Sequence, residues 1–151
     1  MVLLEGHVQR PGGFEWRQGM RVSDVVRSVS EMQPNPDLDY ALIGREVQPA
    51  RRIEMIYVNL GQAISNPDSA ADLELEPRDR LFTFGAAQNR QAQVEDLLSL
   101  LREQASYNQP PQIVTIRGNV RFPGEYPLVR NMTVDDLVKF SAGLNADTQL
   151  D

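Results

Sequence analysis

The sequence of 151 residues contains no cysteine, one histidine and one tryptophan. Without cysteine, the chain forms no disulfide and has no thiolate ligand for zinc or an iron–sulfur cluster. The single histidine, His7, has no second histidine with which to share a metal ion, so we interpret it as a surface or packed side chain. These absences predict a protein without a metal site or other cofactor, and they leave its compartment open.

The sequence has fewer basic than acidic side chains: 15 Lys and Arg and 21 Asp and Glu, for a formal net charge of −6. Nucleic-acid binding depends on clustered basic side chains that release counterions, so we expect no nucleic-acid partner. No apolar run approaches the roughly 18 residues of a membrane-spanning helix. Residues 1–5 are too short for a signal peptide. Because the chain starts inside a strand pattern and stops after a helix signal, we expect a piece of a longer protein.

Catalytic motifs are also missing from the sequence. There is no phosphate-binding loop ending in Gly-Lys-Ser or Gly-Lys-Thr, and His7 is the only histidine that a catalytic triad could use. Asp135 and Asp136 form a carboxylate pair, but they fall in the first turn of an expected helix, where the helix dipole favours acidic residues. The sequence therefore predicts a non-enzymatic protein.

One sequence pattern occurs twice, at a distance of 112 positions. Residues 2–14 align without a gap on residues 114–126, and residues 20–26 align on residues 132–138. Apolar residues, turn residues and the acidic residue at a helix start all recur in register. Such internal similarity is typical of a tandem module.

The first copy predicts a β-hairpin followed by a helix. Residues 2–8 alternate between apolar and more polar side chains, as in a half-buried strand. We expect residues 11–13 to form the turn and Phe14 and Trp16 to lie in the second strand. A helix then begins near Ser23. The expected apolar face of this helix consists of Val22, Val25, Val26 and Val29, and the expected structural turn residues of both copies are Gly6, Pro11, Gly12, Gly118, Pro123 and Gly124.

Further strands are expected at residues 40–43, 53–60 and 80–84, with a short crossover at 61–67 and a tight turn at 77–79. Between the first two strands, the glycine, proline and arginines of residues 44–52 indicate an exposed connection. Four or five strands around one helix make a β-grasp arrangement of the α+β class.

Residues 89–105 predict an amphipathic helix that Asn89 caps and whose apolar stripe consists of Val94, Leu97, Leu98, Leu101 and Ala105. This stripe either packs on the adjacent β-grasp unit or contacts a neighbouring subunit. Only the hairpin and helix of a second unit follow. The predicted organisation is therefore a β-grasp domain at 1–84, a helical linker at 85–112, and the N-terminal part of a second domain at 113–151.

The repeated series of alternating apolar residues, Gly, Val, Pro-Gly, an aromatic residue and the helix at 133–138 resembles the SLBB module, the soluble-ligand-binding β-grasp domain. Two units in tandem are similar to the Wza-type polysaccharide export proteins of the Gram-negative outer membrane. Two segments depart from that family: residues 30–32 stand where Ala-Gly-Gly is frequent, and Pro77-Arg78-Asp79 stands for Pro-Gly-Asp.

The resemblance implies a periplasmic, non-enzymatic module that assembles into a ring around a passage for capsular polysaccharide or exopolysaccharide. Its implied partners are further copies of the chain, the polysaccharide and an inner-membrane polysaccharide co-polymerase. The alternative is a β-grasp domain that binds a small molecule or saccharide. Aromatic rings stack on sugars and arginines bind carboxylates, so the candidate saccharide or subunit contacts are Arg10, Trp16, Arg17, Arg51, Arg52 and Arg121.

Overall fold

The computed structural model describes residues 1–48, 52–86, 90–105, 111–116, 124–127 and 129. The chain divides into two units, residues 1–87 and 88–151. Among the described residues, no helix is both long enough and apolar enough to cross a membrane. The division at residue 87 places the helix expected as a linker inside the second unit.

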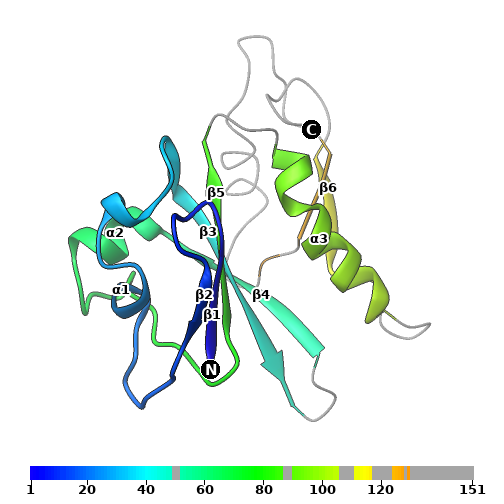
Figure 1. Ribbon diagram of the computed structural model, residues 1–151. Coiled ribbons are helices and arrows are strands. Elements are labelled where there is room, and N and C mark those ends of the chain that lie inside the picture. Colours follow the sequence, from blue (N-terminus) through cyan, green and yellow to red (C-terminus); the bar gives the residue numbers. More distant parts are fainter. Residues whose placement is uncertain (49–51, 87–89, 106–110, 117–123, 128, 130–151) are drawn as a thin grey trace. The chain divides into compact units, whose positions relative to one another are not determined.

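The first unit contains a mixed five-stranded sheet in the order β2-β1-β5-β3-β4 (Figure 1). The neighbouring strands β1 and β5 are parallel, and the other pairs are antiparallel. This α/β arrangement is consistent with the expected β-grasp-like module. The elements of the unit are β1 (Val2–Gly6), β2 (Gly12–Phe14), α1 (Val22–Val25), the 3₁₀ turn η1 (Val29–Glu31), β3 (Pro36–Val47), β4 (Arg52–Val58), α2 (Leu60–Ser65) and β5 (Arg80–Gly85).

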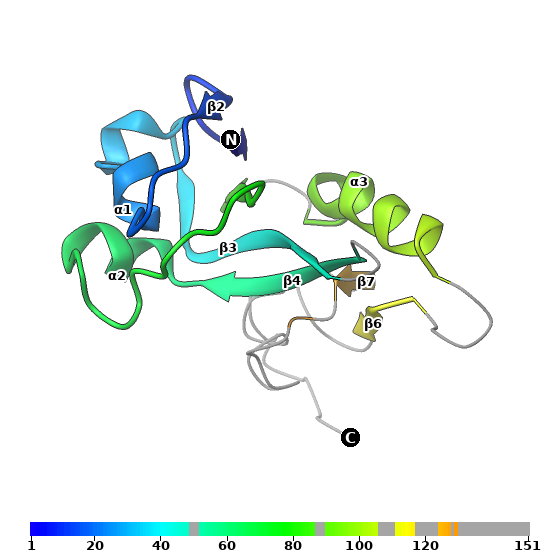
Figure 2. The same cartoon turned by 90° about the horizontal axis from the view of Figure 1, so that it is seen from below.

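The two short helices lie beside each other and contribute to one hydrophobic core (Figures 1 and 2). Side chains of a strand alternate between its two faces, so each central strand gives every second residue to this core. The core residues are apolar and almost completely buried. They include Val2 and Leu4 of β1, Val22 and Val25 of α1, Ala41 and Ile43 of β3, Ile56 and Val58 of β4, Leu60 and Ala63 of α2, and Leu81 of β5.

The predicted turn at residues 11–13 is wrong, because Gly12 and Gly13 already pair with β1 as the first residues of β2. The chain reverses earlier, through residues 7–11. Gly6 begins this loop with a φ of +97°, a conformation that glycine adopts without strain. A Cβ at Gly6 would lie 2.1 Å from the carbonyl oxygen of Thr83. The close approach of β5 therefore leaves room only for glycine at position 6. A Cβ at Gly12, by contrast, would meet nothing within 4 Å.

The predicted long valine-faced helix is also wrong. α1 is a single turn that ends at Val25; the backbone of the next residue, Val26, is extended, and Val29 is 43% exposed. Two physical reasons explain the early end. β-branched valines restrict their rotamers in a helix, and Ser28 starts a separate turn by accepting a hydrogen bond from the Ser30 amide at 3.2 Å.

The predicted exposed connection at residues 44–46 belongs instead to β3, which pairs with β4 as far as Val47. Gly44 is buried, and the side chain of Arg45 is only 18% exposed. Arg45 donates two hydrogen bonds to the fully buried carboxylate of Asp79, at 3.1 and 2.8 Å. This partner lets a charged side chain occupy a central strand.

The turn before β5 is confirmed: the Asp79 amide donates to the Glu76 carbonyl at 3.2 Å. Arg78 occupies this turn with a φ of +70°. It stands where the SLBB-like pattern has glycine, and it adopts the left-handed conformation that glycine favours. The departure in sequence therefore leaves the turn in place.

The second unit contains α3 (Arg90–Glu103) and a hairpin of β6 (Ile113–Ile116) and β7 (Gly124–Pro127). α3 contacts β7, and Arg102 forms a 2.6 Å ion pair with Glu125. The predicted apolar stripe is confirmed, because Val94, Leu97, Leu98 and Leu101 are buried and Ala105 is half-buried. The contact of α3 with β7 agrees with packing on the adjacent unit, the first of the two alternatives. The expected cap Asn89 and the helix at 133–138 lie outside the described residues.

The two hairpins have the same pairing. Each residue pair of the first hairpin has a counterpart in the second, 112 positions later. The pairs are Val2–Phe14, Leu3–Gly13 and Leu4–Gly12 in the first hairpin, and Val114–Tyr126, Thr115–Glu125 and Ile116–Gly124 in the second. Gly124, like Gly12, begins the second strand rather than forming the turn.

Candidate ligand-binding cleft

The first unit contains an open cleft of about 420 Å³ between its β-hairpin, α1 and η1. Sites for small molecules commonly measure about 300–1,000 Å³. The lining combines apolar, polar and charged side chains, and its residues are Leu4, Gln9, Arg10, Phe14, Val25, Arg27, Ser30 and Glu31.

The apolar part of the cleft comes from the core. Leu4 and Val25 are buried, and Phe14 is half-buried and packs against the core cluster. β-strand alternation places Leu4 on the face of β1 that faces α1. The cleft therefore has a fixed apolar floor that includes one aromatic ring.

The polar rim is braced by hydrogen bonds between the hairpin loop and η1. The Gln9 amide donates to the Glu31 carbonyl at 3.0 Å. The Gln9 side chain donates to the Ser30 and Met32 carbonyls at 3.0 and 3.1 Å. Val8 forms a bridge with Met32. These contacts hold the loop that carries Arg10 at a fixed place beside η1.

The charges of the cleft are two arginines and one glutamate. Arg10 and Arg27 are exposed, and they make no ion pair or side-chain hydrogen bond with another described residue. Each of the other described arginines of the first unit takes part in an ion pair, a hydrogen bond or another electrostatic or ring contact. Together with Glu31, Arg10 and Arg27 give the lining a net charge of +1 (two arginines minus one glutamate).

The structure separates the residues that the sequence grouped as candidate contacts. Arg10 lines the cleft. Trp16 packs against the core and donates from its indole nitrogen to the Leu75 carbonyl at 2.9 Å, and Arg17 lies 3.8 Å from Asp24. Arg52 begins β4, which lies at the opposite edge of the sheet from β2. Arg51 and Arg121, together with the turn residues Gly118 and Pro123, lie outside the described residues.

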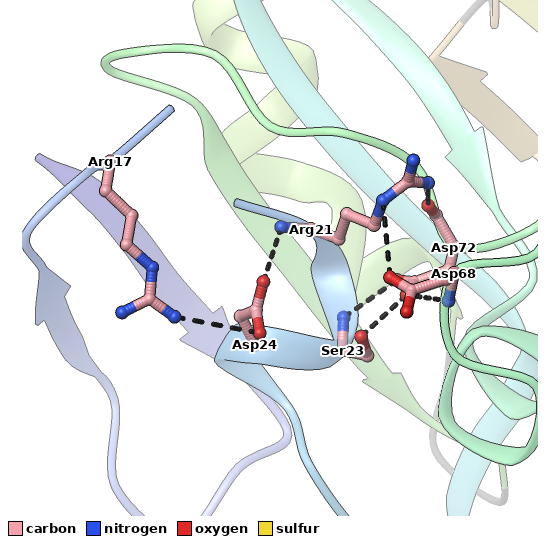
Figure 3. A network of polar contacts seen from close by, with 6 residues as sticks. All are labelled: Arg17, Arg21, Ser23, Asp24, Asp68 and Asp72. Carbon is pink, nitrogen blue, oxygen red and sulfur yellow. Dashed lines mark hydrogen bonds and ion pairs between the residues drawn. The ribbon is translucent and has the colours of Figure 1, made fainter. Parts of the chain in front are cut away.

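A second polar cluster lies at the start of α1 and is structural (Figure 3). The fully buried carboxylate of Asp72 accepts hydrogen bonds from the Ser23 amide at 2.9 Å, the Ser23 hydroxyl at 2.6 Å and the Asp68 amide at 2.9 Å. Arg21 donates to the Asp72 carbonyl at 2.7 Å. The oxygens of Asp72 accept hydrogen bonds that join α1 to the loop before β5. The cluster therefore holds the helix in place, and its polar groups are already satisfied within the protein.

Two ion pairs hold β5 between its neighbours. Hydrogen bonding to Asp79 raises the pKa of Arg45, against the opposing effect of burial. Hydrogen bonding to Glu5, at 2.8 and 3.0 Å, raises the pKa of Arg80 in the same way. Both guanidinium groups therefore stay charged and serve the sheet. No group of three or more potential metal ligands occurs among the described residues.

The first unit is a small α/β module with an open cleft, and comparison with protein families agrees with the expected kind of module. The model of the SLBB domain matches residues 1–29 and 113–151, the two segments that carry the repeated pattern. The match confirms the resemblance of these two segments to the SLBB domain. Comparison with curated proteins and with solved structures finds no match.

The sequence did not point to most of the cleft. Arg27, Ser30 and Glu31 escaped notice because the sequence predicts a helix whose apolar face continues to Val29. Gln9 escaped notice because its partners lie more than 20 positions away. The available signal was Ser28, a residue that starts helices and turns more readily than it continues them.

Proposed function

We propose that this chain is a non-enzymatic module of a Wza-type outer-membrane polysaccharide export protein. It acts in the periplasm, where copies assemble into a ring that supports a passage for capsular polysaccharide or exopolysaccharide. An inner-membrane polysaccharide co-polymerase is its expected protein partner.

The observation that carries this proposal is the presence of two SLBB segments in one chain, with hairpins of identical register. SLBB is a family of binding domains, which favours a binding role over catalysis. We further propose that the second hairpin begins a second β-grasp module. Repeated modules of one kind suit side-by-side contacts around a symmetry axis.

Sedimentation velocity of the chain over a range of concentrations tests the assembly part of the proposal. We expect oligomers that grow with concentration and that carry a fluorescently labelled acidic exopolysaccharide into the sedimenting boundary. A chain that stays monomeric and leaves the polymer behind would contradict the proposal.

A second candidate function is the binding of a small molecule or saccharide without assembly, and the cleft favours it. The same experiment separates the two functions. A strict monomer that binds a small ligand tightly would support the second function and remove the first.

A further inference from the structure

We infer that the cleft between the β-hairpin, α1 and η1 binds a sugar carboxylate, of the hexuronate class. Nothing in the SLBB match assigns a ligand to these residues. The inference rests on the proposed function in one respect: the sugar acid would be a unit of the exported polymer.

The two arginines of the cleft have no ion pair with another described residue. Arg10 and Arg27 come from different segments, the hairpin loop and the stretch after α1, yet they line the same cleft. A guanidinium group presents several donors in a plane and suits a carboxylate. Elsewhere in the described first unit the guanidinium groups of Arg45 and Arg80 already hold carboxylates. Arg10 and Arg27 are the ones left to bind an anion from outside.

The other side chains of the cleft suit a sugar acid better than a simple anion. Glu31 opposes a bare anion such as sulfate, but its carboxylate accepts hydrogen bonds from hydroxyl groups. Ser30 adds a hydroxyl whose oxygen lies 3.0 Å from that of Ser28. Phe14 and Leu4 offer an apolar surface to the C–H face of a sugar ring. A ligand with one carboxylate, several hydroxyls and one apolar face fits all of these groups.

The loop that lines the cleft is held in place before any ligand binds. Gln9, which lines the cleft, makes three hydrogen bonds to the carbonyl groups of Ser30, Glu31 and Met32. A site whose polar groups are already held loses less conformational entropy on binding. The exposed arginine side chains are the parts that still have to become ordered.

Titration of the ¹⁵N-labelled chain with sodium D-glucuronate, followed by NMR, tests the inference. We expect saturable shifts of the amides of residues 9, 10, 27, 30 and 31, with a dissociation constant of about 1 mM, as for a single weakly held sugar. D-glucose and sodium sulfate at the same concentrations should give at least tenfold weaker binding.

The double variant Arg10→Gln, Arg27→Gln should raise the dissociation constant for glucuronate at least tenfold. The matched control is Arg17→Gln, which removes an exposed arginine outside the cleft and should change the constant less than twofold. Trp16 fluorescence establishes that both variants are folded, because this indole packs against the core. Equal binding of glucose, equal binding of sulfate, or an unchanged constant in the double variant would each overturn the inference.

The outcome is separable from that of the proposed function. Glucuronate binding by a chain that remains monomeric and ignores the polymer would uphold the cleft and remove the export role. Assembly and polymer binding by the unaltered chain, with no glucuronate shift in that same chain, would uphold the export role and remove the cleft.

Discussion

The two hairpins of this chain have the same residue pairing but different supports. In the first unit, β1 lies parallel to β5, and Gly6 approaches the backbone of Thr83 so closely that no side chain fits. In the second unit, β7 lies against α3 and is joined to it by Arg102 and Glu125. The pairing of a hairpin is therefore encoded locally, within about thirteen residues, whereas its support comes from distant parts of the chain. Substitutions in each of the two units test this difference in support.

The largest effect is expected for Gly6→Ala. The new Cβ would collide with the Thr83 carbonyl and would need an unfavourable positive φ, so we expect a loss of at least about 3 kcal/mol in unfolding free energy. Urea unfolding followed by Trp16 fluorescence reports the first unit, because Trp16 is the only tryptophan. Gly12→Ala is the control and should cost less than about 1 kcal/mol. Equal losses in both variants would show that β5 does not constrain the first hairpin.

Asp79→Ala should have the next largest effect. The substitution removes the buried carboxylate partner of Arg45 and leaves it only the exposed carboxylate of Glu76, 3.4 Å away, so we expect a loss of about 3 kcal/mol. The control Asp39→Ala removes an exposed carboxylate and should change stability by less than about 0.5 kcal/mol. Hydrogen exchange in β6 should stay unchanged, since this support belongs to the first hairpin alone. Similar urea midpoints for the two variants would refute the role of Asp79.

A smaller effect is expected at the turn before β5. Arg78→Gly and Arg78→Ala both remove the exposed 3.5 Å contact with Glu46, but only alanine keeps the strain of a side chain at positive φ. The glycine variant should therefore be more stable than the alanine variant by about 1 kcal/mol. Thermal unfolding measures the difference. An alanine variant as stable as the glycine variant would mean that residue 78 does not have the left-handed conformation.

The smallest effect is expected in the second unit, for Arg102→Gln. The ion pair with Glu125 is 41% and 45% exposed, so it should contribute only about 0.5 kcal/mol. Hydrogen exchange of the α3 amides detects the loss, and Glu95→Gln on the same helix is the control. The effect should disappear in about 1 M salt, where charges are screened beyond about 3 Å. A salt-independent loss would indicate packing rather than charge.

The sequence was sufficient for features that depend on neighbouring residues. The alternation of residues 2–4 and their copy 112 positions later predicted two hairpins, and the spacing of Leu97, Leu98 and Leu101 predicted the buried stripe of α3. Periodicity carries this information because a side chain's direction follows from its position along a strand or helix.

Features that depend on distant residues were mispredicted. Arg45 looked exposed because its partner Asp79 lies 34 positions away. The first reversal was placed at the Pro-Gly pair because nothing near Gly6 indicates the approach of Thr83. The cleft was missed for the same reason, since it joins the hairpin loop to η1 through hydrogen bonds that span more than 20 positions. Long-range contacts leave no local pattern to read.

The central claim is that one hairpin occurs twice in this chain with an identical register. Nuclear Overhauser effects between backbone protons of facing strands measure that register directly. We expect contacts between Leu3 and Gly13 and, in the same spectrum, between Thr115 and Glu125. Contacts from Thr115 to residue 124 or 126 as its facing partner would mean that the second hairpin has a shifted register, and this would contradict the account.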